Sequence, residues 1–387
     1  MSDESQWDLG LRALLEHMLK VEASDLYLTV GSPPVFRIDG VGYPAKQLLS
    51  ADQIELMARS MTSKAQQAEL AHKLELNLAI ASSSGGRFRV NMLRQRGEPA
   101  MVIRLVRTKI KTLAELELPP ILADVIGSKR GLVLLVGGTG SGKSTTLAAM
   151  IDHRNRSSTG HIITVEDPVE FVHAHQKCIV TQREVGIDTL TYGDALKNAL
   201  RQAPDVILIG EIRDAETMES AITFAETGHL CVSTLHSNNA DQAIERILNF
   251  FPPSRQQEIR LQLSLNLRAI VSQRLVVSAT GGRAAALEIL LDTPRIKDLI
   301  KRGQTDAIKD AMEQGVVEGC QTFDSALVAL VASGKIAPAV ALQAADSPNN
   351  LRLRLKRIAT GEPATPTTAP TLRLVPATPA VSSRQTR

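Results

Sequence analysis

A glycine-rich segment in this chain of 387 residues, Gly137-Gly-Thr-Gly-Ser-Gly-Lys-Ser144, separates two contrasting sequence patterns. Before it, Gly131–Val136 is a continuous apolar run of the kind that forms a strand buried on both faces. After it, Thr145–Asp152 has helical spacing. The segment satisfies the pattern G-x-x-x-x-G-K-S/T in the strand–loop–helix context that the pattern requires. We therefore predict an α/β domain built around a phosphate-binding loop.

Glycine suits such a loop because consecutive backbone N–H groups must face one phosphate chain, and a Cβ would block that approach. Lys143 is expected to reach the β- and γ-phosphates of a nucleotide, and the Ser144 hydroxyl to bind Mg²⁺. The alternative, a glycine-rich turn with an unrelated lysine, is disfavoured because strand, loop and helix are in register. The residues predicted to bind the nucleotide are Gly137, Gly138, Thr139, Gly140, Ser141, Gly142, Lys143, Ser144 and Thr145.

The remaining patterns divide the chain into several parts. Further apolar runs at 161–165, 205–209 and 230–235 predict more buried parallel strands that alternate with helices. In the N-terminal part we predict a helix over 7–20, a hairpin around 39–40, a helix over 51–73 and strands over 76–80, 86–92 and 101–105. The expected parts are an α+β domain over 1–112, a linker helix over 113–127, an α/β core over 128–255, a mainly helical part over 256–357 with a short strand pair at 273–277 and 284–289, and a disordered Pro/Thr-rich basic tail over 358–387.

Charge and aromatic content argue against a general nucleic-acid binder. The chain has 44 Lys and Arg residues and 41 Asp and Glu residues. The segment 351–387 alone contains seven of the basic residues and only one acidic residue, a Glu. Residues 1–350 therefore carry a net charge of −3, from 37 basic and 40 acidic residues. Aromatic residues make up only 3% of the chain, which leaves few side chains for stacking on bases. No nucleic-acid partner is expected.

The cysteines and the apolar runs indicate the compartment. Cys178, Cys231 and Cys320 are odd in number, far apart and free of CxxC spacing, so neither a disulfide framework nor a four-thiolate zinc site is expected. No apolar run approaches the roughly 20 residues that span a bilayer, and the N-terminal sequence lacks the pattern of a signal peptide. We therefore expect a cytoplasmic protein.

A phosphate loop alone does not distinguish a kinase from an ATPase, so the acidic residues at other strand ends matter. Glu166 and Asp167 follow the apolar run at 161–165, and Glu211 follows the run at 205–209. One acid can hold the Mg²⁺ shell while another polarises an attacking water. Either acid taken alone could instead cap a helix. Together with the phosphate loop, they favour hydrolysis.

Histidines give a third set of candidates. His229 and His236 are separated by an odd number of positions, so they lie on opposite faces of a regular strand unless the strand ends before His236. His236 is the better candidate for sensing the γ-phosphate, while His229 is as readily a structural residue. The segment His173-Ala-His-Gln-Lys-Cys178 contains metal-ligand residue types, but we interpret it as a solvated loop.

At this point the residues resemble a known family, the hexameric secretion ATPases of type IV pili and type II secretion. The resemblance runs from about residue 5 to residue 357 and rests on four motifs in the family's order. These are Gly137–Thr145 (Walker A), Val165–Phe171 (Asp box), Leu208–Asp214 (atypical Walker B) and Thr227–His236 (His box). The resemblance implies a RecA-like P-loop ATPase core, an N-terminal PAS-like α+β domain and a helical C-terminal extension. It also implies that the His-box strand inserts between the P-loop and Walker B strands.

The resemblance also implies roles for single residues. Glu166 takes the position of the water-activating glutamate and Glu211 lies on the metal side, although the reverse assignment is left open. The family brings arginines of the N-terminal domain onto the γ-phosphate across the cleft, and Arg96 and Arg104 are the candidates here. The alternative interpretation is that both are solvated surface arginines without a role in catalysis. Such arginines would make hydrolysis depend on domain closure, because the charge that they stabilise develops at the transition state.

The branch of the family follows from further segments. Assembly ATPases of the family typically carry a four-cysteine zinc element, and this chain has no CxxC. Within the retraction branch, PilT typically has an Ala-Ile-Arg-Asn-Leu-Ile element, where this chain reads Thr293-Pro-Arg-Ile-Lys-Asp-Leu-Ile300. The segments 236–240, 263–275 and 345–353 resemble the PilU type. This implies an ATP- and Mg²⁺-dependent ring, a hexamer, at the cytoplasmic side of the inner membrane. Its implied partners are a PilT-type retraction ATPase and the pilus platform protein.

Other functions remain open at this stage. The same core could translocate DNA or serve DNA uptake, although the net charge of residues 1–350 argues against a basic channel. A nucleotide-gated adaptor with little hydrolysis would also fit the motifs. The basic tail could contact anionic lipid, but charges spread through a Pro-rich segment more often only increase solubility.

Overall fold

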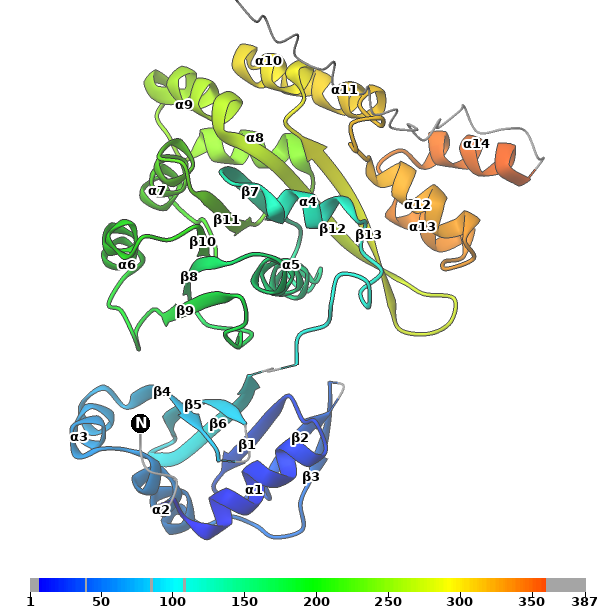
Figure 1. Cartoon of the computed structure of the whole chain (residues 1–387). Helices are drawn as coiled ribbons and strands as arrows, with labels where there is room; N and C mark the ends of the chain where they lie inside the picture. Colours follow the sequence, from blue (N-terminus) through cyan, green and yellow to red (C-terminus); the bar gives the residue numbers. More distant parts are fainter. Residues whose placement is uncertain (1–6, 39, 84–85, 107–108, 360–387) are drawn as a thin grey trace, which may run out of the picture.

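The structure is a computed structural model that describes residues 7–38, 40–83, 86–106 and 109–359 (Figure 1). Within these residues the strands form two sheets, one of six strands and one of seven. The N-terminal sheet and its helices form the blue and cyan part at the bottom of Figure 1, and the larger sheet lies above it. The disordered tail was predicted over 358–387, but residues 358 and 359 belong to the last helix, Pro348–Ala359. The rest of the predicted tail lies outside the described residues.

The N-terminal sheet is antiparallel throughout and has the order β3-β2-β1-β6-β5-β4. Its strands are β1 (Asp25–Thr29), β2 (Val35–Ile38), β3 (Val41–Pro44), β4 (Glu75–Ala81), β5 (Arg87–Gln95) and β6 (Glu98–Val106). Its helices are α1 (Leu9–Lys20), α2 (Ala51–Met61) and α3 (Lys64–Lys73). Leu11, Leu15 and Met18 recur at helical spacing in α1 and are buried, while Phe88 and Val90 alternate with polar residues in β5. The two periodicities together build one apolar core.

The helix predicted over 51–73 is interrupted at Thr62 and Ser63. Ser63 caps α3 by accepting a hydrogen bond from the N–H of Gln66, whose side chain in turn accepts one from the N–H of Ser63. Such a reciprocal cap satisfies backbone donors that would otherwise be unpaired at a helix start. A second helix therefore begins where the sequence pattern alone indicated one continuous helix.

The larger sheet has the order β13-β12-β7-β11-β10-β8-β9. Its strands are β7 (Gly131–Val136), β8 (Gly160–Glu166), β9 (Cys178–Glu184), β10 (Val206–Ile209), β11 (Leu230–Leu235), β12 (Leu267–Val277) and β13 (Arg283–Leu291). Only the pairing of β12 with β13 is antiparallel among these strands. Every residue of β7 and of β11 is buried, as expected for central parallel strands. The strand β11 lies between β7 and β10, the insertion that the resemblance implied.

Helices pack around this sheet, and a further group of helices, α12 to α14, lies beside β13 (Figure 1). They are α4 (Ile121–Gly127), α5 (Lys143–Ser157), α6 (Tyr192–Ala199), α7 (Ala215–Glu226), α8 (Ala240–Asn249), α9 (Pro253–Asn266), α10 (Pro294–Arg302), α11 (Ile308–Gln314), α12 (Phe323–Ala332), α13 (Pro338–Ala344) and α14 (Pro348–Ala359), with 3₁₀ turns at Leu200–Gln202 and Thr305–Ala307. The helices α12, α13 and α14 pack on one another in a smaller cluster around Phe323 and Leu327.

Three segments differ from the sequence prediction. The linker helix predicted over 113–127 is limited to Ile121–Gly127, because Pro119 and Pro120 interrupt the helical backbone. The part over 256–357 is less helical than expected, since β12 and β13 are long strands that join the core sheet. The strand Cys178–Glu184 was not predicted, because it is a partly buried edge strand whose polar residues do not form the continuous apolar run seen in the central strands.

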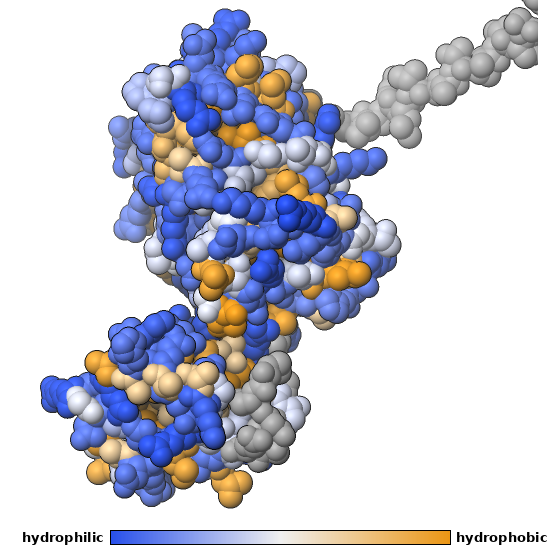
Figure 2. All heavy atoms as spheres, turned by 90° about the vertical axis from the view of Figure 1, so that its left-hand side faces the viewer, coloured by the Kyte–Doolittle hydropathy of each residue, from blue (hydrophilic) through white to orange (hydrophobic). Residues whose placement is uncertain are grey.

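The two sheets with their helices form two lobes that meet at a narrow waist (Figure 2). The face in that view is largely hydrophilic, with apolar side chains scattered over it in small groups. Across the part of the chain that the structure describes, no helix has both the length and the apolar character needed to cross a bilayer.

Candidate active site

The phosphate-binding loop joins β7 to α5, as the sequence pattern required. Gly142 caps α5 with a left-handed φ of 88°. Gly137 has a φ of 151°, and a Cβ there would lie 2.5 Å from Ser141 Oγ and 2.6 Å from the carbonyl oxygen of Gln273. Only glycine fits this close approach between the loop and β12.

Lys143 is the first residue of α5 and its side chain is buried over the loop. Its Nζ donates to the carbonyl oxygens of Gly137, at 2.8 Å, and Gly138, at 3.0 Å. Burial lowers the pKa of Lys143, while the nearby charge of Glu211 acts in the opposite direction. The buried Ser141 Oγ has no hydrogen-bond partner. A loop that holds an ammonium group and an unsatisfied hydroxyl is suited to anionic oxygens.

A cavity of about 300 Å³ lies beside this loop, at the carboxyl ends of β8, β10 and β11. It is lined by Lys143, predicted to bind the nucleotide, and by the residues of the core predicted for catalysis and metal binding, namely Ser144, Glu166, Glu211 and His236. A second cavity, of about 470 Å³, also borders this loop and is lined in part by Leu116, Leu118 and Leu275. The loop therefore borders two cavities, and the acidic side chains and His236 line the first of them.

Glu166 ends β8 at the wall of the cavity of about 300 Å³. Its Oε1 accepts hydrogen bonds from Thr164 Oγ1 at 2.7 Å and from Gln182 Nε2 at 3.3 Å. Burial raises the pKa of Glu166 above its ordinary value, and the two hydrogen bonds offset part of that rise. A carboxylate with a raised pKa and a fixed orientation is suited to accept a proton from water.

Gln182 holds Glu166 and the Asp-box segment Val165–Phe171 in one arrangement. Its Nε2 also donates to the carbonyl oxygen of Phe171 at 2.9 Å, and its Oε1 accepts from the backbone N–H of His173 at 2.8 Å. Gln182 lies on β9, the strand that the sequence reasoning missed. Its role could have been suspected only if the polar run 178–184 had been interpreted as a strand.

His173 is buried, in contrast to the solvated loop expected for this segment. Burial lowers the pKa of His173 to about 4, so the imidazole is neutral near pH 7. Its Nδ1 has no hydrogen-bond partner. Among the described residues, no cluster of His, Cys, Asp and Glu side chains could hold a metal ion without other ligands.

Glu211 follows β10 and lies opposite Glu166 in the pocket. Its Oε1 lies 3.1 Å from His236 Nε2, and its Oε2 accepts from Arg213 Nε at 2.7 Å. His236 directly follows the last residue of β11, so the strand ends in time for its side chain to line the pocket. His229 lies before β11 and contacts Thr227 and the backbone of Phe224, which indicates a structural residue.

The two arginines predicted from the N-terminal domain are not brought to this pocket within one chain. Arg96 has a φ of 54° and forms, with Gly97, the tight turn between β5 and β6. Arg104 on β6 donates from Nε to Asp25 Oδ1 at 2.8 Å, an ion pair that raises the pKa of Arg104. Neither lines the cavity around Lys143. The expectation that they meet the phosphate is therefore not met by the arrangement within a single subunit.

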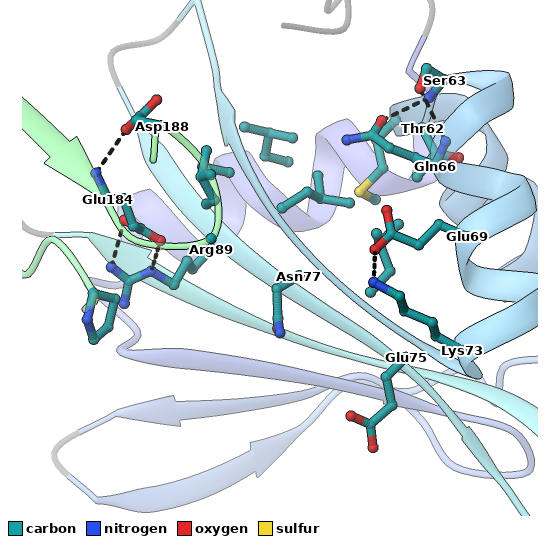
Figure 3. Close-up of a pocket in the computed structure, with 18 of the residues that line it drawn as sticks. Thr62, Ser63, Gln66, Glu69, Lys73, Glu75, Asn77, Arg89, Glu184 and Asp188 are labelled. Atoms are coloured by element: carbon teal, nitrogen blue, oxygen red, sulfur yellow. Dashed lines mark hydrogen bonds and ion pairs between the residues drawn. The ribbon is translucent and has the colours of Figure 1, made fainter. Parts of the chain in front are cut away.

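Arg89 on β5 is the arginine that reaches the core. Its Nε and Nη2 donate to the two carboxylate oxygens of Glu184, at 3.1 and 3.0 Å (Figure 3). Nη2 also donates to the carbonyl oxygen of Val169 at 2.7 Å. Glu184 Oε2 in turn accepts from the N–H of Val169 at 3.2 Å. Sequence reasoning did not select Arg89 because several arginines of that stretch share the same local pattern.

The Arg89 contact borders a large crevice between the two lobes. It has a volume of about 1590 Å³ and is lined by α3 and β4 on one side and by the turn Glu184–Asp188 on the other (Figure 3). Glu69, Lys73 and Glu75 line the N-terminal side of it. The crevice leaves room for the lobes to change their angle about the Arg89 contact.

A family model described as "Type II/IV secretion system protein" matches residues 3–328. The chain belongs to this family. The match takes in both the N-terminal sheet and the core with its phosphate-binding loop. The secretion ATPase family that the motifs indicated is thus confirmed.

Relatives within the family indicate the branch. The chain is 51% identical over 345 residues to the type IV pilus ATPase PilU of Pseudomonas aeruginosa, covering 89% of this chain and 90% of that protein. It is 40% identical to the pilus retraction ATPase PilT of the same organism, covering 88% of this chain and all of PilT. A crystal structure of the pilus retraction motor PilT with bound ADP aligns with a TM-score of 0.83 and 39% identity, over 89% of this chain and 100% of that one. The predicted resemblance and fold class are confirmed.

Proposed function

We propose that this member of the type II/IV secretion system family is an ATP-hydrolysing motor subunit that powers or assists type IV pilus retraction. The observation that carries the proposal is the cavity at the carboxyl ends of β8, β10 and β11, where Lys143, Glu166, Glu211 and His236 surround one space. The likeness to PilU and to PilT supports the retraction branch. Within that branch, the chain works in the manner of PilU, together with a PilT-type motor.

The chain's own residues account for the chemistry of hydrolysis. Lys143 and the N-terminus of α5 bind the triphosphate. On binding, Lys143 Nζ gives up its hydrogen bonds to the carbonyl oxygens of the loop and donates to phosphate oxygens instead. Glu166 orients the attacking water and accepts its proton, because burial raises its pKa and makes the carboxylate a stronger base. His236, beside Glu211, contacts the γ-phosphate and registers its presence.

The same pocket suits a magnesium ion. Ser144 and Glu211 would hold it, and both offer oxygen atoms, the ligands that Mg²⁺ prefers. The described residues form no metal cage of their own, which agrees with an ion held mainly by substrate phosphates and water. When bound, the ion supplies neutralisation of the phosphate charge.

Assembly into a hexameric ring completes the proposal. Neither Arg96 nor Arg104 lines the pocket of its own chain. We therefore assign their contact with the γ-phosphate to a neighbouring subunit or to a closed arrangement of the lobes. Arg89 couples the lobes directly, because it holds the Asp-box segment next to Glu166. Hydrolysis can then change the angle between the lobes. The ring acts on the cytoplasmic side of the inner membrane through the pilus platform protein.

A retraction assay tests the proposal in a piliated bacterium that lacks its own PilU-type gene. The wild-type chain is expected to restore twitching motility, and Lys143→Ala is expected to fail at equal protein levels. A matched control, Lys177→Ala, removes an exposed lysine outside the pocket and should behave as wild type. Repeating the assay without the PilT-type motor tests the partnership. Restoration of motility by Lys143→Ala to the wild-type extent would contradict a motor role.

A further inference from the structure

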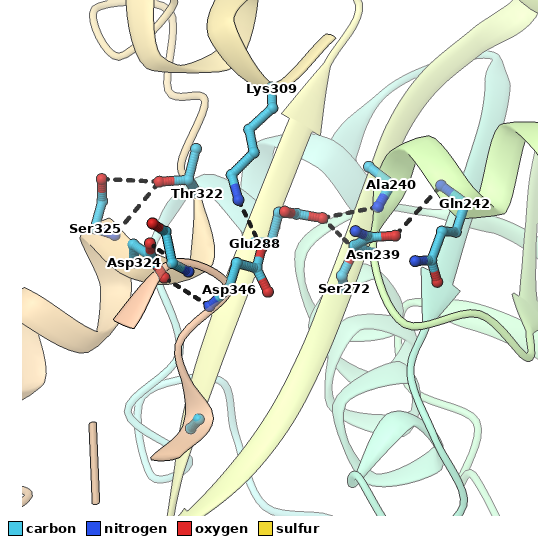
Figure 4. Close-up of polar contacts among 12 residues, drawn as sticks. Asn239, Ala240, Gln242, Ser272, Glu288, Lys309, Thr322, Asp324, Ser325 and Asp346 are labelled. Atoms are coloured by element: carbon cyan, nitrogen blue, oxygen red, sulfur yellow. Dashed lines mark hydrogen bonds and ion pairs between the residues drawn. The ribbon is translucent and has the colours of Figure 1, made fainter. Parts of the chain in front are cut away.

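We propose that Glu288 is a positioning residue for hydrolysis, which fixes the start of α8 and thereby the turn that carries His236. This inference rests on the proposed function. Glu288 lies on β13 with only 3% of its surface exposed. Its Oε1 accepts hydrogen bonds from the backbone N–H of Ala240 at 2.8 Å and from Ser272 Oγ at 2.9 Å (Figure 4). Three elements, β12, β13 and α8, therefore meet at one carboxylate.

The contact with α8 is additional to the helix's ordinary cap. Asn239 is the capping residue and accepts from the N–H of Gln242 at 3.3 Å. Glu288 satisfies a different orphan donor, the N–H of Ala240, from another part of the chain. A negative group is favoured at a helix N-terminus, but a neutral residue would cap the helix at a lower cost of burial. A buried carboxylate here is better explained by its precise attachment of α8 to the β12–β13 hairpin.

The attachment point is close to the active site along the chain. His236 lies 3.1 Å from Glu211, and the short turn His236–Asn239 leads directly to Ala240. Ser237 Oγ donates to the carbonyl oxygen of Asn239, within the turn. Asn238 Nδ2 donates to Gln242 Oε1 and so connects the turn to α8. The position of the turn thus follows the position of α8. A displacement of Ala240 would move His236 relative to Glu211.

The hairpin also contacts the phosphate-binding loop. Ser272 faces Glu288 across the strand pair, and the next residue, Gln273, points to the other face. Gln273 Oε1 accepts from Thr146 Oγ1 on α5 at 2.7 Å. Two adjacent residues of β12 therefore support the two sides of the nucleotide pocket. Ser272, through Glu288 and α8, supports the side of His236. Gln273, through its contact with α5, supports the side of Lys143. A shift of the hairpin would be transmitted to both.

The charged groups near Glu288 come from three elements. Asp241 on α8 and Asp346, between α13 and α14, both disfavour its charged form. Lys309 on α11 faces the same region, but its Nζ lies 2.9 Å from Asp346 Oδ2 (Figure 4). Asp346 is also paired with Arg274 of β12 at 2.7 Å. Burial, the largest cause, raises the pKa of Glu288 to about 7. The strength of the attachment therefore changes with pH in the neutral range, since an ionised carboxylate is the stronger acceptor.

The test compares steady-state hydrolysis of ATP by the full-length wild type, Glu288→Gln and Ser272→Ala, with kcat expressed per nucleotide-binding site. We expect Glu288→Gln to lower kcat about tenfold with KM within about twofold, as for other residues that act through an active-site residue. Ser272→Ala keeps the carboxylate and should lower kcat about threefold. Asp346→Asn is the matched control, because it alters the same polar cluster without contact to α8. At about pH 8, where Glu288 is ionised with or without Asp346, it should retain the wild-type kcat. Titration of binding sites removes the contribution of unfolded protein.

The pH profile separates a positioning role from a merely structural one. The ratio of the wild-type kcat to that of Glu288→Gln should be close to one at about pH 6 and rise to its full value at about pH 8, with a midpoint near 7. An unchanged kcat in both variants, or a ratio that is independent of pH, would overturn the proposal. Absence of hydrolysis in the wild type itself would instead overturn the proposed function.

Discussion

The guanidinium of Arg89 and the carboxylate of Glu184 join the two lobes of the protein through a two-point ion pair, with Nε–Oε1 and Nη2–Oε2 distances of 3.1 and 3.0 Å. Both side chains are largely buried, with 17% and 6% of their surfaces exposed. The pair also holds the peptide of Val169 from both sides. The N-terminal lobe therefore contacts the Asp-box segment three residues beyond Glu166.

We expect Arg89→Ala to loosen the Asp-box segment, because Glu184 would remain buried without its cation. Amide hydrogen exchange at Val169 and over 184–188 should accelerate by roughly tenfold or more. Arg94→Ala is the matched control, since it removes an ion pair with Glu55 that stays inside the N-terminal lobe. Unchanged exchange at Val169 in Arg89→Ala would contradict the described contact.

Separate roles for the two glutamates predict different kinetic defects. Glu166→Gln should bind ATP with nearly the wild-type affinity and lose about 10²–10⁴-fold in kcat, because only the proton acceptor is removed. Glu211→Gln should instead weaken the Mg²⁺-dependent part of nucleotide binding. Binding of a fluorescent ATP analogue with and without Mg²⁺, followed by single-turnover hydrolysis, distinguishes the two. The opposite pattern would reverse the assignment of the roles.

Gln182 provides a test of how Glu166 is oriented. Gln182→Leu removes the donor to Glu166 Oε1 and the contacts with Phe171 and His173, while it retains a similar volume. We expect kcat to fall about tenfold with little change in KM, because the residue acts through Glu166 and not on the nucleotide. In the Glu166→Gln background the same substitution should have almost no further effect. Additive losses in the double variant would show that Gln182 acts independently of Glu166.

Much of the core could be predicted because its signals are local. The strand–loop–helix around Gly137–Ser144 and the apolar strands β10 and β11 are recognisable from a few consecutive residues. The strand β9 and the length of β12 were not predictable in this way. Gln182, Gln273 and Glu288 are polar residues whose burial is satisfied by partners distant in sequence, and no local pattern announces that. The linker helix was overestimated because helical spacing outweighed Pro119 and Pro120.

The site shows the same division. Lys143, Glu166, Glu211 and His236 could be selected because each stands at a fixed place in a motif, at the end of a strand or the start of a helix. Arg89 could not be preferred over Arg96 and Arg104, since the choice depends on how the two lobes meet. Contacts between lobes, or between subunits, are set by tertiary geometry that a single local pattern does not carry.

His173 predicts how stability depends on pH. Its pKa is lowered from 6.5 to about 4, so the unfolded chain takes up a proton at a higher pH than the folded chain does. The contribution is fully present above pH 6.5 and is lost as pH falls toward about 4, by about 3 kcal/mol in all. Urea unfolding of His173→Gln should lack this part of the acid destabilisation. His72→Gln, which removes an exposed histidine on α3, should keep it, and an identical acid profile for wild type and His173→Gln would contradict the assignment.

The most direct measurement is the rate of phosphate release from ATP by the purified Lys143→Ala variant, beside wild type and the exposed-lysine control Lys177→Ala. We expect Lys143→Ala to lose at least about 100-fold in turnover, since the ammonium group over the loop is removed, and Lys177→Ala to turn over as wild type does. Phosphate release by Lys143→Ala at the wild-type rate, in preparations freed of other ATPases, would contradict this expectation.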